Sequence, residues 1–185
     1  MPKLLNVGGG PVPVPAEYQD YDVDLLDIDI DLHPEIWLDA RKIATDLEPA
    51  QYDVVLCSHN LEHYYEHEVP GVLWGFYHVL KMDGFADIRV PDVLAVMNAV
   101  VQHNLGLRDV LYQSAVGPIR VLDVLWGWQK QIARSSYSYY AHKVGFSQDM
   151  LGRLLKEAHF ERVMIASKNY EIRALAYKRI PKENE

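Results

Sequence analysis

Residues 52–63 read Tyr-Asp-Val-Val-Leu-Cys-Ser-His-Asn-Leu-Glu-His, an apolar run followed directly by polar side chains. The first six residues are apolar or β-branched except for Asp53, a composition typical of a strand buried in a parallel sheet. The run turns polar at Ser58 and His59, and open α/β sheets bind ligands at the carboxyl ends of such strands. The stretch therefore predicts an α/β fold with a ligand site beside residues 58–63.

The same stretch contains histidine and glutamate at a spacing similar to that of metal ligands. These residues are His59, Glu62 and His63. No cysteine cluster or further acidic cluster in the sequence completes a metal site with them. The sequence therefore predicts that the protein holds no metal.

A second candidate strand, Leu4–Val7, ends in the glycines Gly8-Gly9-Gly10, which Pro11 follows. Glycine has no Cβ, so a ligand can approach the backbone of such a turn closely, although a plain tight turn would have the same sequence. Prolines recur at alternate positions from residue 11 to residue 15 and exclude a helix interior. We therefore expect a ligand-binding turn followed by an extended loop.

An acidic residue follows the next predicted strand, Leu25–Ile30. Asp29 stands at the end of this run, where a carboxylate downstream of a glycine turn can accept hydrogen bonds from ribose hydroxyls. Asp27 competes for the role, because residues two apart in a strand lie on one face. The pairing of glycine turn and acidic strand end indicates an adenosine-type ligand.

The order of the remaining elements favours a mostly parallel sheet with helices on both faces and an antiparallel C-terminal hairpin. Further strands are expected at 36–38, 85–90, 160–166 and 171–177, and helices at 69–80, 93–101, 121–132 and 147–159. A turn at 81–84 is expected to end the first of these helices. Residues 93–145 are expected to form a helical, aromatic insert within a single domain over residues 1–185.

Composition limits the classes of function. The chain has 185 residues and a formal net charge of −8, which disfavours binding to nucleic acid because phosphate backbones are also negative. Its single cysteine, Cys57, cannot form an intramolecular disulfide. No signal-like or membrane-spanning apolar stretch is visible. A cytoplasmic protein without membrane partners is the expectation.

Several segments together resemble the class I S-adenosylmethionine-dependent methyltransferases of the small type 11-like group, with their Rossmann-like sheet. The similar segments are Leu5–Pro11, Leu26–Asp29, Asp39–Arg41, Ser58–His63, Val79–Gly84 and Ala141–Phe146. The resemblance implies S-adenosylmethionine as cofactor and an unidentified small molecule or sugar or lipid intermediate as substrate. It implies cofactor contacts at Asn6, Gly8, Gly9, Gly10, Asp29, Asp39, Ala40, Ser58 and His59.

Two features depart from that family's pattern. Asn6 stands where the family usually has an acidic residue, so it brings no charge to meet the cofactor's ammonium. The helix that usually follows the glycine turn is replaced by the proline-containing loop, which removes a set of aligned N–H donors. These departures favour a second hypothesis, a catalytically inactive protein that kept the fold and serves in binding or scaffolding.

Methyl transfer from a sulfonium needs mainly positioning and desolvation, and a base only if the acceptor must lose a proton. His59 and His142 are the candidate bases, although each could instead be an orienting or packing residue. The aromatic residues of the insert could line a substrate cleft, pack on the sheet or form a homodimer interface. A nicotinamide dehydrogenase is disfavoured, because prolines stand where its fingerprint needs a third glycine opening a helix.

Overall fold

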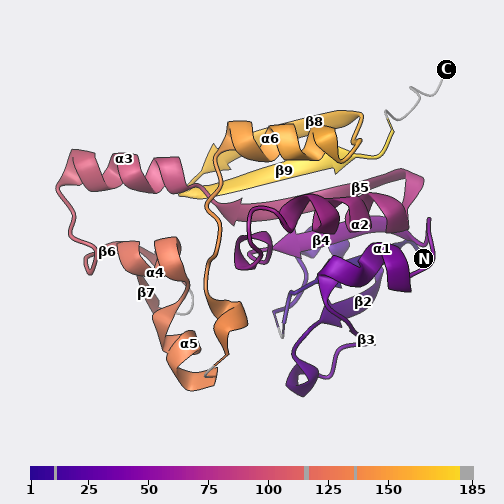
Figure 1. Cartoon of the computed structure of the whole chain (residues 1–185), viewed down its shortest axis with the longest axis horizontal. Coiled ribbons are helices and arrows are strands. Elements are labelled where there is room, and N and C mark those ends of the chain that lie inside the picture. Colours follow the sequence, from indigo (N-terminus) through magenta and orange to yellow (C-terminus); the bar gives the residue numbers. More distant parts are fainter. Residues whose placement is uncertain (11, 115–116, 136, 180–185) are drawn as a thin grey trace.

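The computed structural model describes residues 1–10, 12–114, 117–135 and 137–179. Its centre is a seven-stranded sheet in the order β3-β2-β1-β4-β5-β9-β8 (Figure 1). The parallel strands are β1 (Lys3–Val7), β2 (Asp22–Asp27), β3 (Ile36–Trp37), β4 (Tyr52–Ser58) and β5 (Leu80–Pro91). An antiparallel hairpin of β8 (Arg162–Lys168) and β9 (Glu171–Tyr177) completes the sheet beside β5. The predicted fold class is confirmed.

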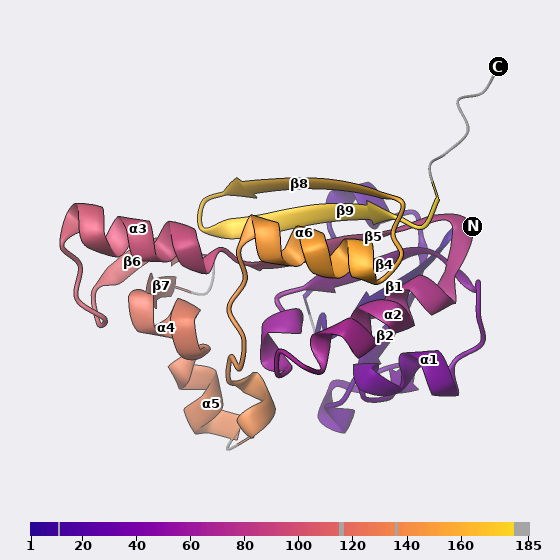
Figure 2. The same cartoon turned by 45° about the horizontal axis from the view of Figure 1, so that its top comes forward.

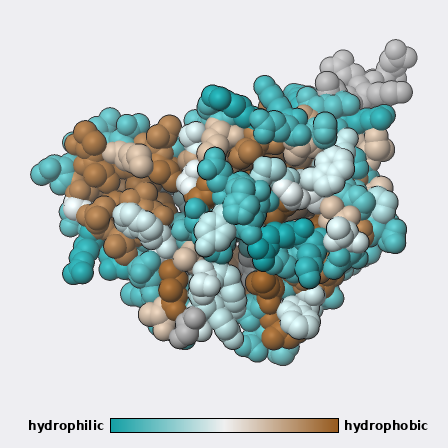
Figure 3. Space-filling model, viewed as in Figure 1, coloured by the Kyte–Doolittle hydropathy of each residue, from teal (hydrophilic) through white to brown (hydrophobic). Residues whose placement is uncertain are grey.

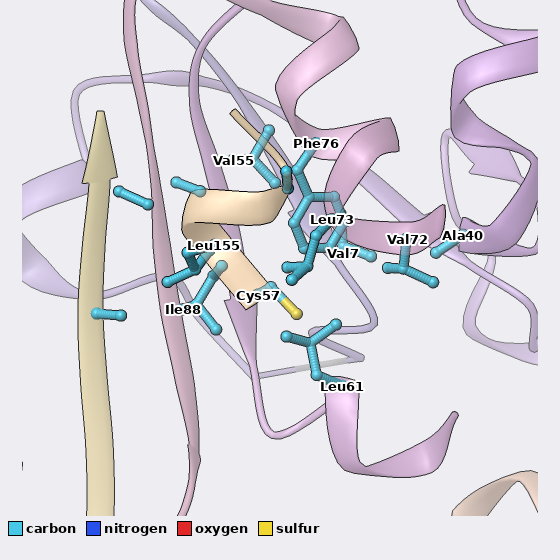
Figure 4. Packing of buried hydrophobic residues seen from close by; sticks show 14 of the residues in the cluster. Val7, Ala40, Val55, Cys57, Leu61, Val72, Leu73, Phe76, Ile88 and Leu155 are labelled. Carbon is cyan, nitrogen blue, oxygen red and sulfur yellow. The ribbon is translucent and has the colours of Figure 1, made fainter. Parts of the chain in front are cut away.

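Three α-helices cover one face of the sheet (Figure 2). They are α1 (Ile43–Asp46), α2 (Val69–Val79) and α6 (Gln148–Glu157). The main core lies between these helices and the sheet, and Figure 4 shows Cys57 of β4 among side chains that include Leu73 and Phe76 of α2. The apolar positions of α2 recur at helical spacing, so their burial against the sheet stabilises the helix.

The opposite face carries a smaller apolar cluster. Leu4, Val54 and Leu56 point to this side and pack around Tyr18. Tyr18 ends the short 3-10 helix η1 (Ala16–Tyr18), the one helical turn in the described part of the β1–β2 connection. The expected absence of a full helix after the glycines is confirmed, and Pro11 itself lies outside the described residues.

The insert leaves and rejoins the sheet at one point. Asp92 pairs with Phe146 in an isolated bridge, and the amide of Val93 donates to the carbonyl of Phe146 at 3.0 Å. Between these ends lie α3 (Val93–His103), β6 (Val110–Ser114), β7 (Gly117–Arg120), α4 (Val121–Trp126), α5 (Gln129–Ser135) and the 3-10 helix η5 (Ser138–Tyr140). Helix α3 extends away from the sheet, and α5 turns back toward it (Figures 1 and 2).

Apolar side chains gather on the outer surface of this insert. Figure 3 shows them over α3 and β6, at the left of the view. Leu94, Met97 and Val101 of α3 are more than half exposed. None of the described helices has the length and apolar character needed to span a bilayer.

Two element boundaries near the site differ from the predictions. Strand β2 covers Asp22–Asp27 rather than 25–30, because the Asp29 side chain accepts a hydrogen bond from the Asp31 amide at 3.1 Å and starts the 3-10 helix η2 (Ile30–Leu32). Strand β5 begins at Leu80, so residues 81–84 lie inside the strand rather than in a turn. A register shift against β4 between Tyr52 and Val54 accommodates them.

Other boundaries also moved. The helix predicted over 121–132 is broken at Gly127, whose φ of 91° does not continue a right-handed helix, into α4 and α5. The last hairpin turns at Asn169 and Tyr170, with φ of 53° and 66°. The hairpin of β6 and β7 was not predicted, because alternation over four or five residues is too short a signal.

Candidate functional site

A cavity of about 430 Å³ lies at the carboxyl ends of β1, β2 and β4. This volume falls within the range of small-molecule sites, about 300–1,000 Å³. Its walls come from the glycine turn, the segments after β2, β3 and β4, and the insert. The lining residues are Gly8, Gly9, Gly10, Asp27, Ile28, Leu32, Asp39, Arg41, His59, Asn60, His63, Tyr64, Tyr65, Glu68, Gln131, Tyr139, Tyr140 and Lys143.

The glycine turn is shaped by both conformation and crowding. Gly8 and Gly10 have φ of 66° and 55°, a left-handed conformation that favours glycine. A Cβ on Gly8 would lie 2.0 Å from the Asn60 amide nitrogen, so Asn60 already fills that space. A Cβ on Gly10 would meet nothing closer than Leu32 at 3.8 Å. The open approach to the backbone is therefore at Gly10.

The two aspartates after β2 have different environments. Asp27 is 8 % exposed, lines the cavity and accepts the Asp29 amide at 2.9 Å, and the amide of Gly10 also hydrogen-bonds to its carboxylate. Burial raises the pKa of Asp27, against the opposing effect of these amides. Asp29 caps η2 and accepts the Tyr140 hydroxyl at 3.1 Å, and it does not line the cavity. Asp27 is therefore the better-placed acceptor.

An ion-pair group borders the cavity after β3. Asp39 accepts the Arg41 amide at 3.0 Å, and the Arg41 guanidinium binds both Asp39 and Glu68. Burial alone would raise the pKa of Asp39, but its hydrogen bonds from Arg41 outweigh burial and lower it. Asp39 is consequently a carboxylate held in place beside the cavity.

His59 lies between two carboxylates. Its Nε2 is 2.8 Å from Glu171, and its Nδ1 is 3.4 Å from Glu62. Burial lowers the pKa of His59, but the interactions with Glu171 and Glu62 outweigh burial and raise it to about 10. At neutral pH His59 is then a protonated imidazolium, which donates hydrogen bonds and cannot accept a proton.

Solved structures of other proteins share this architecture. A SAM-dependent methyltransferase from Archaeoglobus fulgidus is 14 % identical, with 96 % of this chain aligned to 86 % of that chain at a TM-score of 0.59. A SAM-dependent methyltransferase from Methanosarcina mazei is 13 % identical, and 96 % of this chain aligns to 92 % of that chain at a TM-score of 0.57. This chain has the fold of the class I S-adenosylmethionine-dependent methyltransferases.

A third methyltransferase structure contains ligands. It is the 1,6-didemethyltoxoflavin-N1-methyltransferase of Burkholderia thailandensis with bound 1,6-didemethyltoxoflavin and S-adenosylhomocysteine. It is 14 % identical, with 96 % of this chain aligned to 71 % of that chain at a TM-score of 0.55. No protein-family model and no curated protein matches this chain.

Within this methyltransferase fold, the cavity brings together part of the predicted site. Gly8, Gly9, Gly10, Asp39 and His59 line it. The other predicted residues do not line it: Asn6, Asp29, Ala40, Ser58 and His142. The Asn6 amide packs under the glycine turn, where a Cβ on Gly9 would lie 2.2 Å from its nitrogen.

His142 is held away from the cavity by the insert. Its Nδ1 donates to the carbonyl of Val124 at 2.8 Å, and it lines a separate small space beside Glu62. Burial lowers the pKa of His142, against the effect of Glu62. This position matches the structural alternative for His142 better than the role of a base facing the cavity.

Among the lining residues from the insert, Tyr139 and Tyr140 belong to the aromatic residues that the sequence offered as a possible cleft lining, whereas Lys143 was missed. Tyr139, Tyr140 and Lys143 reach the cavity because η5 and the segment after it fold back over the sheet edge. Asn60 and Arg41 belong to the segments Ser58–His63 and Asp39–Arg41, but only the packing of the chain shows that they line the cavity. No periodicity could have identified these contacts.

Proposed function

We propose that this protein is an S-adenosylmethionine-dependent methyltransferase that acts on a small molecule. The cavity at the carboxyl ends of β1, β2 and β4 is the observation that carries the proposal, since this edge is where open α/β sheets bind ligands. Its volume suits a nucleoside together with part of a second small molecule. The methyltransferase fold makes S-adenosylmethionine the first candidate.

The residues present fit that cofactor. Asp27 offers carboxylate oxygens to the ribose hydroxyls, and the backbone of the glycine turn faces the amino-acid part at Gly10. The side-chain amide oxygen Oδ1 of Asn60 is buried and has no hydrogen-bond partner among the described residues, so a ligand donor would satisfy it. Asp39 and Ala40 remain the proposed neighbours of adenine.

The cofactor supplies a methyl group already activated on a sulfonium. The chain's own residues then have to position an acceptor in line with that group and exclude water. The insert is the proposed source of acceptor selectivity, because it contributes four residues to the cavity lining: Gln131, Tyr139, Tyr140 and Lys143. A small molecule or a sugar or lipid intermediate remains the proposed substrate class.

Calorimetry with S-adenosylmethionine and S-adenosylhomocysteine tests the proposal. We expect one site per chain with a micromolar or tighter dissociation constant for both, and no comparable binding of NAD. Binding of NAD instead would favour the dehydrogenase hypothesis. Binding of neither nucleoside would favour the inactive scaffold, the hypothesis that Asn6 and the missing first helix support.

The homodimer stays a prediction. The exposed apolar side chains of α3, Leu94, Met97 and Val101, are the surface to examine. Light scattering of the intact protein measures the assembly directly, and a monomeric mass would remove this prediction without affecting the proposed activity.

A further inference from the structure

Glu62 is a buried carboxylate without hydrogen-bond partners. It lies in the 3-10 helix η4 (Leu61–His63), its residue is 1 % exposed, and both carboxylate oxygens lack a hydrogen bond within the described ranges. Its contact with His59, 3.4 Å from Nδ1, is an ion pair without hydrogen-bond geometry. A buried carboxylate is stable only when it is paired or binds a cation, and His59 is one such partner. Both oxygens still lack hydrogen bonds, so they remain able to bind a second cation.

Two histidines face Glu62 with their tautomers set by the backbone. His63 Nδ1 lies 3.2 Å from the carbonyl oxygen of Ala141, and His142 Nδ1 lies 2.8 Å from that of Val124. A carbonyl oxygen only accepts, so each Nδ1 carries the proton and each Nε2 keeps its lone pair. Metal-binding histidines are oriented in this way, with the second nitrogen donating to a carbonyl or carboxylate.

The three side chains converge. One ligand atom from each of Glu62, His63 and His142 lies within 4.8 Å of the other two. The Nε2 of His142 is 4.0 Å from a Glu62 oxygen. The imidazole rings of His63 and His142 pack edge to face, with their centroids 5.0 Å apart. Tetrahedral zinc would hold such atoms about 3.3 Å apart, so modest side-chain movement closes the site.

We propose that Glu62, His63 and His142 bind one divalent transition-metal ion, with zinc as the first candidate. Two imidazoles and one carboxylate suit zinc and leave a fourth position for water or a substrate atom. His63 also lines the large cavity, so the metal site adjoins the proposed cofactor site and is separate from it. The proposal goes beyond methyl transfer and does not depend on it.

Such a metal would join the insert to the sheet. His142 belongs to the insert, whereas Glu62 and His63 follow β4, and the amide of Lys143 already donates to the Glu62 carbonyl at 2.7 Å. This hydrogen bond holds the insert on the loop after β4 and therefore brings His142, the third proposed ligand, into position. A bound ion would add to that connection and raise the stability of the whole chain.

Zinc titration of the full chain, without a histidine tag and after removal of metal with a chelator, tests the proposal. We expect one equivalent of zinc with a submicromolar dissociation constant, a higher melting temperature, and visible absorption bands of four-coordinate cobalt(II) in the substituted protein. Glu62→Gln and His142→Gln should each weaken zinc binding at least 100-fold. His103→Gln, at an exposed histidine ending α3, is the matched control and should change nothing.

Two results would overturn the proposal: less than half an equivalent of zinc bound at micromolar concentrations, or equal losses in the ligand variants and the His103 control. Circular dichroism of the metal-free variants checks folding, and Glu62→Gln keeps the side-chain shape while removing the carboxylate charge. S-adenosylhomocysteine binding to the metal-free protein is measured in parallel. Retained nucleoside binding without zinc binding would refute the metal site alone, and the reverse would refute the cofactor proposal alone.

Discussion

Replacing Asp27 with asparagine separates the proposed ribose contact from the stability of the fold. Asp27 ends β2, lines the cavity and accepts backbone amides, including that of Asp29 at 2.9 Å. Asparagine keeps the shape and one acceptor oxygen but removes the charge. Any loss of nucleoside affinity would then report on the carboxylate rather than on a cavity or a collapsed loop.

The expected size follows from two ribose hydroxyls. A hydrogen bond to a charged group contributes about 1.5–3 kcal/mol, and one between neutral groups about 0.5–1.5 kcal/mol. Losing the charge at two bonds thus weakens binding by about 2–3 kcal/mol, roughly 30- to 150-fold. Isothermal calorimetry with S-adenosylhomocysteine measures the change.

Stability should move in the opposite direction. Burial raises the pKa of Asp27 above its unfolded value of 3.8, so the native state binds the proton more tightly than the unfolded chain does. The protonated Asp27 side chain therefore contributes to the free energy of unfolding at pH below 3.8, and this contribution is lost as the pH rises through the pKa of the folded state. At neutral pH the neutral asparagine should leave the melting temperature unchanged or higher.

Asp29→Asn is the matched control. Asp29 does not line the cavity, and its carboxylate accepts the Asp31 amide and the Tyr140 hydroxyl, so its change should reduce affinity by less than about threefold. An Asp27→Asn protein that binds S-adenosylhomocysteine as well as the wild type would refute the reasoning. So would a loss in Asp29→Asn as large as that in Asp27→Asn.

Three further changes test the turn, the insert and their connection. Gly8→Val should destabilise the apo protein by about 2 kcal/mol or more in chemical denaturation, because its Cβ would lie 2.0 Å from Asn60 in a left-handed backbone, and a normal denaturation midpoint would contradict this. Asp123→Asn should lower the free energy of unfolding by about 1–3 kcal/mol at pH 7, because the hydrogen bonds of Arg120 lower the pKa of the buried Asp123. The difference from wild type should vanish as the pH falls through that lowered pKa, below 3.8. A difference that does not change with pH would contradict this explanation. Tyr140→Phe should leave the affinity for S-adenosylhomocysteine within about threefold of wild type and change the selectivity among methyl acceptors. A loss of nucleoside affinity with unchanged acceptor selectivity would instead assign the insert to cofactor binding.

The fold could be predicted because its signals are local and periodic. The apolar run 52–57, the glycine turn at 8–10 and the helical spacing over 69–80 are each readable within a window of about ten residues. Burial against the sheet then stabilises the predicted elements, so local pattern and packing agree. Boundaries shifted where a side chain competed with the backbone, as at Asp29, or where a register shift absorbed residues, as in β5.

The choice between Asp27 and Asp29 could not be made from spacing. Both are acidic, they lie two residues apart, and either satisfies the same pattern. The structure distinguishes them because the backbone turns at Asp29 and carries its carboxylate out to Asp31 and Tyr140. The strand ends three residues earlier than predicted, at Asp27, and this is enough to change which side chain faces the cavity.

By itself, the sequence determined the sheet, its glycine turn and the polar edge after β4, because strand and turn propensities act over short distances. Only the tertiary structure decided which distant side chains share a space. His142 meets Glu62 and His63 because the insert's two ends are joined at Asp92 and Phe146 and its last segment folds back over the sheet edge. Such proximity is set by the packing of whole elements, and no periodicity in the chain encodes it.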